Sequence, residues 1–297
     1  MNHSRRHVIL HYHFFKNAGT TVDSILKNNF RARFARFDSD DHNSVISNEA
    51  LLGFLEAHGE VVALTSHHLR PPKPVDPRFV FHDILFLRHP VARLWSTYEF
   101  YRRAEVGKDP LTAAAKGVTA KRFFEALIAD YPEHACNAQV NLVANAGHKL
   151  PTDADLARAE ELVKAASVVG TAELFDESAV TAEAGLRPIF PAADFSYVPQ
   201  NVSAGRPRSL ADQLESVRQN CGEQIFHRLT DLNQLDLRLT EAATNEILRR
   251  LQQLKNPARQ IRDLRSRCRA QEQAAARIIL ASNHPADFVR YANLGSR

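Results

Sequence analysis

A lysine, a glycine and two threonines lie together between residues 16 and 21, directly after an apolar stretch that predicts a strand. Free backbone N–H groups at the start of a helix attract negative charge, so this segment has the chemistry of an anion site. Gly19 allows close backbone approach, the threonines add hydroxyl donors, and Lys16 adds a mobile positive charge. We therefore predict a phosphate-like site that consists of Lys16, Asn17, Ala18, Gly19, Thr20 and Thr21.

A second predicted anion site follows the apolar stretch 82–87. Arg88 stands at the carboxyl end of this predicted strand, where parallel α/β sheets bind their ligands. Pro90 suits the first position of a helix, which places Ser96 nearly two turns inside that helix. An arginine and a serine that converge on one oxyanion form a phosphate clamp, so we expect Arg88 and Ser96 to act together.

Two adjacent histidines, His67 and His68, follow the predicted strand 61–65. An imidazole has a pKa near neutrality and is therefore suited to removing a proton from an acceptor hydroxyl. We predict His67 as the general base, with His68 as the next candidate. The chain has 14 histidines, most of which must be structural or exposed.

Other ligand motifs are missing from the sequence. The Walker pattern GxxxxGK[ST] and the dinucleotide pattern GxGxxG are both absent, which argues against an ordinary ATP, GTP or NAD site. There is no HExxH motif and no carboxylate cluster with metal-ligand spacing, so we expect no metal.

Strand-like and helix-like stretches alternate along the chain. The predicted strands are residues 8–15, 61–65, 82–87 and 166–170, and the segments between them have helical spacing or proline-rich loop composition. We predict an α/β fold: a P-loop-like three-layer sandwich with a central parallel sheet and a helical C-terminal part. We divide it into an α/β domain, 1–240, and a helical C-terminal extension, 241–297, and expect interruptions near Pro132, Gly147 and Pro257.

The composition is that of an ordinary globular protein. The chain has 297 residues, 44% hydrophobic and 24% charged, with a formal net charge of +4. The charge suits anionic ligands without identifying nucleic acid. Cys136, Cys221 and Cys268 form no CxxC pair, which predicts unpaired thiols. Without an apolar run of 18 residues or a signal peptide, we expect no transmembrane segment and a cytoplasmic location.

The segment 15–21 resembles the 5′-phosphosulfate loop of sulfotransferases that use 3′-phosphoadenosine 5′-phosphosulfate (PAPS). It is most similar to the carbohydrate, heparan-sulfate-type branch and its bacterial-like members, whose loop reads Pro-Lys-Thr-Ala-Gly-Thr-Thr or -Ser. Phe15 and Asn17 replace the usual proline and threonine. In that family the loop holds the 5′-phosphosulfate.

A second stretch is similar to the 3′-phosphate motif of the same family, Leu-Arg-Asp-Pro-x-x-Arg-x-x-Ser-x-Tyr. The residues in register are Arg88, Pro90, Arg93, Ser96 and Tyr98, and His89 replaces the aspartate. The resemblance implies that Arg88 and Ser96 hold the 3′-phosphate. His67 aligns with the catalytic histidine of the family, although Ser66 replaces the glycine before it. Weaker similarities at 168–176 and 201–203 extend the resemblance over residues 7–240.

The resemblance implies in-line transfer of a sulfuryl group from PAPS to a hydroxyl, expected on a carbohydrate, with Lys16 offsetting charge on the leaving oxygen. It implies PAPS as cosubstrate, no metal and no nucleic acid partner. A nucleotide kinase or NTPase and a non-catalytic binding module remain alternatives. Basic residues at 249–269 fit either a solvated helix or a wall for an anionic acceptor.

Overall fold

A parallel five-stranded sheet lies at the centre of the computed structural model, with the strand order β2-β3-β1-β4-β5. The structure describes residues 5–41, 44–105, 110–144, 150–199 and 209–281. The strands are β1 (Arg6–Tyr12), β2 (Phe34–Arg36), β3 (Ala63–Ser66), β4 (Phe79–Leu87) and β5 (Val168–Thr171). The four predicted strands are confirmed with shifted ends. The short edge strand β2 was not predicted, because three residues show no usable periodicity.

Helices occupy most of the remaining described chain. They are α1 (Gly19–Phe30), η1 (Arg31–Arg33), α2 (Asn48–Ala57), α3 (Pro90–Arg103), α4 (Pro110–Ala115), α5 (Ala120–Asp130), α6 (Pro132–Ala135), α7 (Ala138–Ala144), α8 (Asp153–Ala165), α9 (Phe175–Leu186), α10 (Leu210–Cys221), α11 (Glu223–Asp231), α12 (Gln234–Gln252) and α13 (Pro257–Ala281). The expected helix start at Pro90 and the expected interruptions near Pro132 and Pro257 are confirmed, and a new helix begins at each of these prolines, as a proline at the first helical position favours. The expected break at Gly147 and the motif 201–203 lie outside the described residues.

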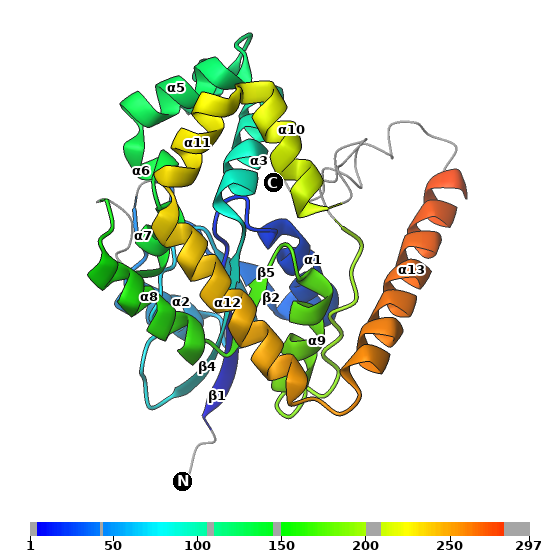
Figure 1. The fold of residues 1–297 in the computed structure, drawn as a ribbon. Coiled ribbons are helices and arrows are strands. Elements are labelled where there is room, and N and C mark those ends of the chain that lie inside the picture. The colour runs from blue at the N-terminus through cyan, green and yellow to red at the C-terminus, as the bar shows by residue number, and fades with distance from the viewer. Residues whose placement is uncertain (1–4, 42–43, 106–109, 145–149, 200–208, 282–297) are drawn as a thin grey trace.

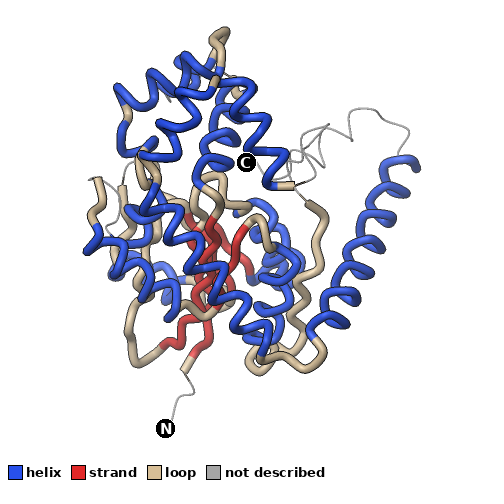
Figure 2. The backbone as a smooth tube through the Cα atoms, in the orientation of Figure 1, coloured by secondary structure: helices blue, strands red, loops and turns tan. Residues whose placement is uncertain are grey.

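The two faces of the sheet are covered by different helices, which gives the predicted three-layer sandwich (Figures 1 and 2). Along β1, Val8 and Leu10 face a core built with α2, α7, α8 and α12, whereas Ile9 faces a core built with α1, α9 and α13. This alternation follows from the two-residue period of a strand buried on both faces. The α/β fold with its central parallel sheet is therefore confirmed.

A third apolar cluster forms a helical cap next to the sheet. Side chains of α3, α5, α10 and α11 pack together around Phe123, Phe124 and Leu229. Figure 1 shows this cap above the point where β4 passes into α3. The cap thereby covers the carboxyl edge of the sheet, where both predicted anion motifs begin.

The C-terminal part is helical, as predicted, and its first helix belongs to the main core. The division at residue 240 falls inside α12, whose Leu239, Ala243 and Ile247 are fully buried in the same cluster as Val8. The following helix, α13, inserts Leu264 into the opposite core. In the described part of the chain, no helix combines the length and the apolar character that a membrane span requires.

The strand order places a topological switch between β1 and β4. From β1 the chain passes to β2 and β3 on one side, and from β4 it continues to β5 on the other. In open parallel sheets a ligand crevice lies outside the carboxyl ends of strands at such a point. Lys16 follows β1 and Arg88 follows β4, so both predicted anion motifs lie at this switch.

Candidate functional site

The turn after β1 has an unusual backbone that leaves the start of α1 open. Lys16 and Ala18 both adopt left-handed conformations, with φ values of 65° and 63°. Such a conformation costs a non-glycine residue roughly 1–2 kcal/mol, so the surrounding contacts must enforce it. Among the described residues, no side chain caps α1 and no acidic residue lies in its first turn. The first N–H groups of α1 are therefore directed at a position suited to an anion.

One buried glutamine, Gln139 of α7, holds the turn against the end of β4. Its Oε1 accepts hydrogen bonds from Asn17 Nδ2 at 2.9 Å and from the Arg88 backbone N–H at 2.9 Å. Its Nε2 donates to the Arg88 carbonyl at 2.8 Å, while Asn17 Nδ2 also donates to the Phe86 carbonyl at 3.0 Å. The Asn17 amide nitrogen thus faces the interior and fixes the turn. Sequence reasoning missed Gln139, because it lies in a short helix far along the chain.

Arg88 brings the two predicted anion motifs into contact. Its Nη1 donates to the Lys16 carbonyl at 3.3 Å, and its Nη2 donates to Oε1 of Gln213 on α10 at 3.3 Å. The guanidinium therefore lies between the turn after β1 and the helical cap. The juxtaposition expected from the two motifs is present in the structure.

The Lys16 ammonium lies over two aromatic rings, and it forms no ion pair with an acid in the described part of the chain. Its Nζ is 4.6 Å from the centre of the Phe100 ring and 5.5 Å from that of Phe15. Burial, followed by the positive charges of Arg88 and Arg103, lowers the pKa of Lys16 to about 8. The positive charges near Lys16 favour an anionic ligand, since bound negative charge would relieve the repulsion between them.

The hydroxyl residues of the two motifs lie on the neighbouring helices. Thr20 and Thr21 are in the first turn of α1, where Thr20 is half-buried and Thr21 is buried. Ser96 is half-buried on α3, the helix that begins two residues after Arg88 and carries Phe100. The structure thus places Ser96 on the helix that Lys16 contacts through Phe100.

His67 forms a hydrogen bond through Nδ1, and its Nε2 has no hydrogen-bond partner among the described residues. Its Nδ1 lies 2.8 Å from the carbonyl oxygen of His13. A carbonyl only accepts hydrogen bonds, so Nδ1 carries the proton and Nε2 of the neutral ring keeps its lone pair. Burial, then electrostatic repulsion between its imidazolium form and His13, lower the pKa of His67 to about 4, so the ring is neutral at pH 7. Asp38 fixes the backbone of this segment by accepting from the His67 N–H at 2.7 Å.

His68 is directed at a different part of the chain. Its side chain is buried, and its Nδ1 accepts a hydrogen bond from the Ser39 backbone N–H at 3.2 Å. Its backbone N–H donates to Ser66 Oγ at 2.9 Å. These contacts join β3 to the loop after β2, which is a structural role. Of the two histidines, His67 is the one whose ring contacts the ring of His13 next to α1, with centroids 4.0 Å apart and the ring planes tilted by 43°.

A buried charged network lies beneath this edge of the sheet. The Asp23 carboxylate on α1 accepts from His11 Nδ1 and His13 Nδ1, both at 2.8 Å, from Thr65 Oγ1 at 2.6 Å and from Arg36 Nη2 at 2.6 Å. Burial alone would raise the pKa of Asp23, but the hydrogen bonds from His11 and His13 hold it well below its usual range. Sequence reasoning missed this network, although the spacing of His11 and His13 already places them on one face of β1.

The same network has the composition of a metal site. Ligand atoms of His11, His13 and Asp23 lie within 4.8 Å of one another. In the described structure, however, both Nδ1 atoms point at Asp23 oxygens as hydrogen-bond donors, and Arg36 adds a positive charge to the same carboxylate. A cation would have to displace those protons and repel that guanidinium. We therefore interpret the network as a support for the adjacent histidines.

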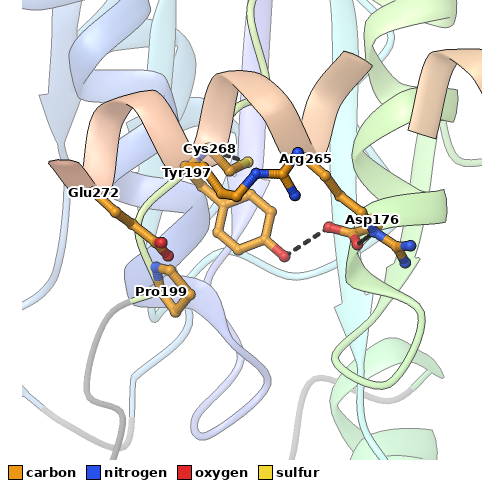
Figure 3. Close-up of a pocket in the computed structure, with 7 residues that line it drawn as sticks. Asp176, Tyr197, Pro199, Arg265, Cys268 and Glu272 are labelled. Carbon is orange, nitrogen blue, oxygen red and sulfur yellow. Dashed lines mark hydrogen bonds and ion pairs between the residues drawn. The ribbon is translucent and has the colours of Figure 1, made fainter. Parts of the chain in front are cut away.

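A separate small cavity of about 190 Å³ lies between α9, α13 and residues 197–199 (Figure 3). Its charged groups already pair with each other, since Asp176 accepts from Tyr197 Oη at 2.9 Å and from Arg265 Nε at 2.6 Å. Pockets for drug-sized ligands usually enclose roughly 300–1,000 Å³. The cavity is thus too small for a nucleotide, and neither Lys16 nor Arg88 lines it.

The basic residues at 249–269 largely have acidic partners in the folded chain. Those in ion pairs are Arg249, Arg250, Arg259, Arg265 and Arg267. The acids come mostly from elements outside this stretch: Glu246, Asp176, Glu183 and Asp194. The pairing favours the interpretation of this stretch as an ordinary solvated surface over that of a wall for an anionic acceptor.

Comparison with known proteins gives a relative of unspecified activity. The chain is similar to an uncharacterized protein of Archaeoglobus fulgidus, with 27% identity over 241 residues, which cover 80% of this chain and 95% of that protein. No protein-family model matches the chain.

Replacing Gly19 with alanine should destabilise the protein, because the side chain of His13 packs against this glycine. A Cβ on Gly19 would overlap the Cδ2–Nε2 edge of the His13 ring, so Gly19→Ala should lower the free energy of unfolding by roughly 1–3 kcal/mol. The control is Gly53→Ala on α2, where a Cβ meets nothing within 4 Å and helix propensity favours alanine by up to about 1 kcal/mol. Urea denaturation measures both. Equal stability of the two variants would contradict the packing of His13 on Gly19.

Stability should fall as the pH falls from 7 towards 5. Burial lowers the pKa of His67 and of His89 to about 4, whereas both titrate near 6.5 when unfolded. The unfolded chain therefore takes up protons first, and each such group lowers stability by at most about 1.4 kcal/mol per pH unit between about 6.5 and 4. His89→Gln should flatten a plot of melting temperature against pH, because it removes one of these two groups. Parallel plots for the wild type and His89→Gln would refute the claim that folding lowers the pKa of His89.

Proposed function

We propose that the protein is a PAPS-dependent sulfotransferase that transfers a sulfuryl group to a hydroxyl of an acceptor, expected to be a carbohydrate. The observation that carries the proposal is the contact of Arg88 Nη1 with the Lys16 carbonyl, 3.3 Å apart. It joins an open helix start after β1 to an arginine after β4, at the switch point of the sheet. A nucleotide with two separated anionic groups suits such a pair of adjacent sites.

In this proposal, each anionic group of the donor has its own residues. The 5′-phosphosulfate occupies the first turn of α1, against the backbone of Gly19 and Thr20 and the hydroxyl of Thr21. The 3′-phosphate binds Arg88 together with Ser96 on α3. Arg88 would exchange its long contacts with Lys16 and Gln213 for a charge-assisted bond to phosphate, which is shorter and stronger.

His67 acts as the base in this mechanism. The acceptor oxygen attacks sulfur in line with the phosphate, its proton passes to Nε2 of His67, and the bond from sulfur to the phosphate oxygen breaks. The hydrogen bond from Nδ1 to the His13 carbonyl aims the ring and makes Nε2 the accepting atom. The low pKa keeps His67 neutral and ready to accept a proton, and the nearby Asp38 carboxylate favours the imidazolium that forms.

Lys16 supplies positive charge where negative charge develops on the leaving phosphate oxygen. Its Nζ lies over the rings of Phe100 and Phe15, so it can move from these rings to the ligand without breaking any ion pair among the described residues. A bound anion would raise the lowered pKa of Lys16 and stabilise its charged form. We further propose a cytoplasmic location, supported by three cysteines that all remain unpaired.

If Lys16 and Arg88 bind the nucleotide, replacing either of them should lower the affinity for it. Calorimetric titration with 3′-phosphoadenosine 5′-phosphate should give saturable binding that weakens at least about tenfold in Lys16→Ala and in Arg88→Ala, because each removes a charge-assisted contact. Arg262→Ala, an exposed arginine on α13, is the control and should bind as the wild type does. Unchanged affinity in both site variants would overturn the assignment, and Mg²⁺-dependent ATP turnover would favour a kinase or NTPase.

If His67 is the base, substitutions of the adjacent residues His67 and His68 should change kcat to different extents. His67→Asn keeps a donor for the His13 carbonyl but loses the accepting Nε2, so kcat should fall by about 10²–10⁴-fold with little change in donor affinity. His68→Gln should lower the melting temperature and change kcat only a few-fold, because His68 supports the loop at Ser39. Transfer of ³⁵S from labelled PAPS to a panel of carbohydrates measures both rates. A larger loss of kcat in His68→Gln would reverse the roles.

A further inference from the structure

His13 is a buried histidine that the mechanism above leaves without a chemical role. Its ring is only 7% exposed, and its Nδ1 lies 2.8 Å from Oδ2 of Asp23. Asp23 is a carboxylate that accepts four hydrogen bonds, so Nδ1 of His13 carries a proton and donates it. The other nitrogen, Nε2, has no hydrogen-bond partner among the described residues.

The unpartnered Nε2 faces the open start of α1. A Cβ added to Gly19 would overlap Cδ2 and Nε2 of His13, so this edge of the ring lies directly over the first residue of the helix. In the described chain no side chain caps that helix start. The Cδ2–Nε2 edge of a largely buried histidine side chain thus lies at the helix start that presents the backbone N–H groups of Gly19 and Thr20.

We propose that His13 is a further donor-binding residue whose Nε2 donates a hydrogen bond to the 5′ anionic group of the nucleotide and takes up one proton from solvent when that group binds. The inference rests on the proposed function, since it concerns the same site. His13 acts here as a binding residue, and His67 keeps the role of base.

The proton uptake follows from the tautomer that Asp23 imposes. With Nδ1–H directed at the carboxylate, neutral His13 presents a lone pair from Nε2 to the helix start. A lone pair repels an anion at that position, whereas an N–H attracts it, so binding and protonation must favour each other. The Asp23 carboxylate offsets the imidazolium charge, as an acid does when it orients a histidine.

Other titratable and charged groups also face His13. His11, on β1, lies beside it with ring centroids 5.4 Å apart, and the tilted ring of His67 has its centroid 4.0 Å away. Arg36 of β2 shares the Asp23 carboxylate, and Lys16 lies in the adjoining turn. Lys16 has a pKa of about 8 and is mostly protonated below pH 7, so measurements between pH 7 and 5.5 separate it from a histidine.

The test uses adenosine 5′-phosphosulfate as the probe, because its anionic groups remain fully ionised across this range. For the wild-type protein, affinity should rise as the pH falls from 7 to 5.5, by at most about tenfold per pH unit for one coupled proton. Calorimetry in buffers of different ionisation enthalpy should register uptake of up to about one proton per nucleotide bound.

Three substitutions assign the proton to His13. His13→Asn keeps a donor for Asp23 and removes Nε2, so it should bind more weakly with a nearly flat pH profile. His13→Gln puts a permanent N–H near the position of Nε2 and should restore affinity without restoring the pH dependence. His67→Asn should retain the pH dependence of the wild type, because it leaves the pair of His13 and Asp23 intact.

These measurements distinguish an error in the role of His13 from an error in the proposed sulfotransferase activity. Two results would overturn the role of His13 and leave the sulfotransferase proposal standing. In the first, the wild type binds the probe tightly with an affinity that does not change with pH. In the second, His13→Asn shows the same pH dependence of affinity as the wild type. A pH dependence that disappears in His67→Asn would assign the proton to His67 and also overturn the inference. Failure of the wild type to bind this probe at any pH, while 3′-phosphoadenosine 5′-phosphate still binds, would overturn the role of His13 alone. Failure to bind either nucleotide would overturn both proposals.

Discussion

The site depends on one buried amide, the side chain of Gln139, which joins two strand ends that are about seventy residues apart in sequence. Its oxygen accepts from Asn17 and from the Arg88 backbone, and its nitrogen donates to the Arg88 carbonyl. Asp236 in turn accepts from the Gln139 and Val140 N–H groups and fixes the start of α7. Because every hydrogen-bonding atom of this amide has a partner, the turn after β1 and the end of β4 keep one relative position.

Electrostatics at this edge of the sheet are arranged in two layers. The inner layer is the Asp23 carboxylate with its donors His11, His13 and Arg36, where negative and positive charges are matched. The outer layer carries Lys16 and Arg88, with neutral His67 beside it. An anion entering the outer layer meets positive charge and helix-start N–H groups, while the carboxylate behind is already fully hydrogen-bonded.

Local patterns in the sequence predicted the fold well, because buried parallel strands read as apolar runs and prolines mark helix starts. They also placed Lys16 and Arg88 at strand ends that meet. They did not predict β2, which is only three residues long, or the partners Gln139, Asp38 and Gln213, since these reach the site through tertiary contacts from distant segments. The distinction between His67 and His68 likewise depends on which carbonyl or amide each ring meets, and neither partner lies nearby in the sequence.

A crystal structure of the protein with 3′-phosphoadenosine 5′-phosphate tests the central claim most directly. The account predicts the 5′-phosphate within hydrogen-bond distance of the Gly19 and Thr20 backbone N–H groups, and the 3′-phosphate on Arg88. One nucleotide would then span the ends of β1 and β4. A nucleotide bound at another surface, with the Gly19 turn and Arg88 left in their present contacts, would contradict it.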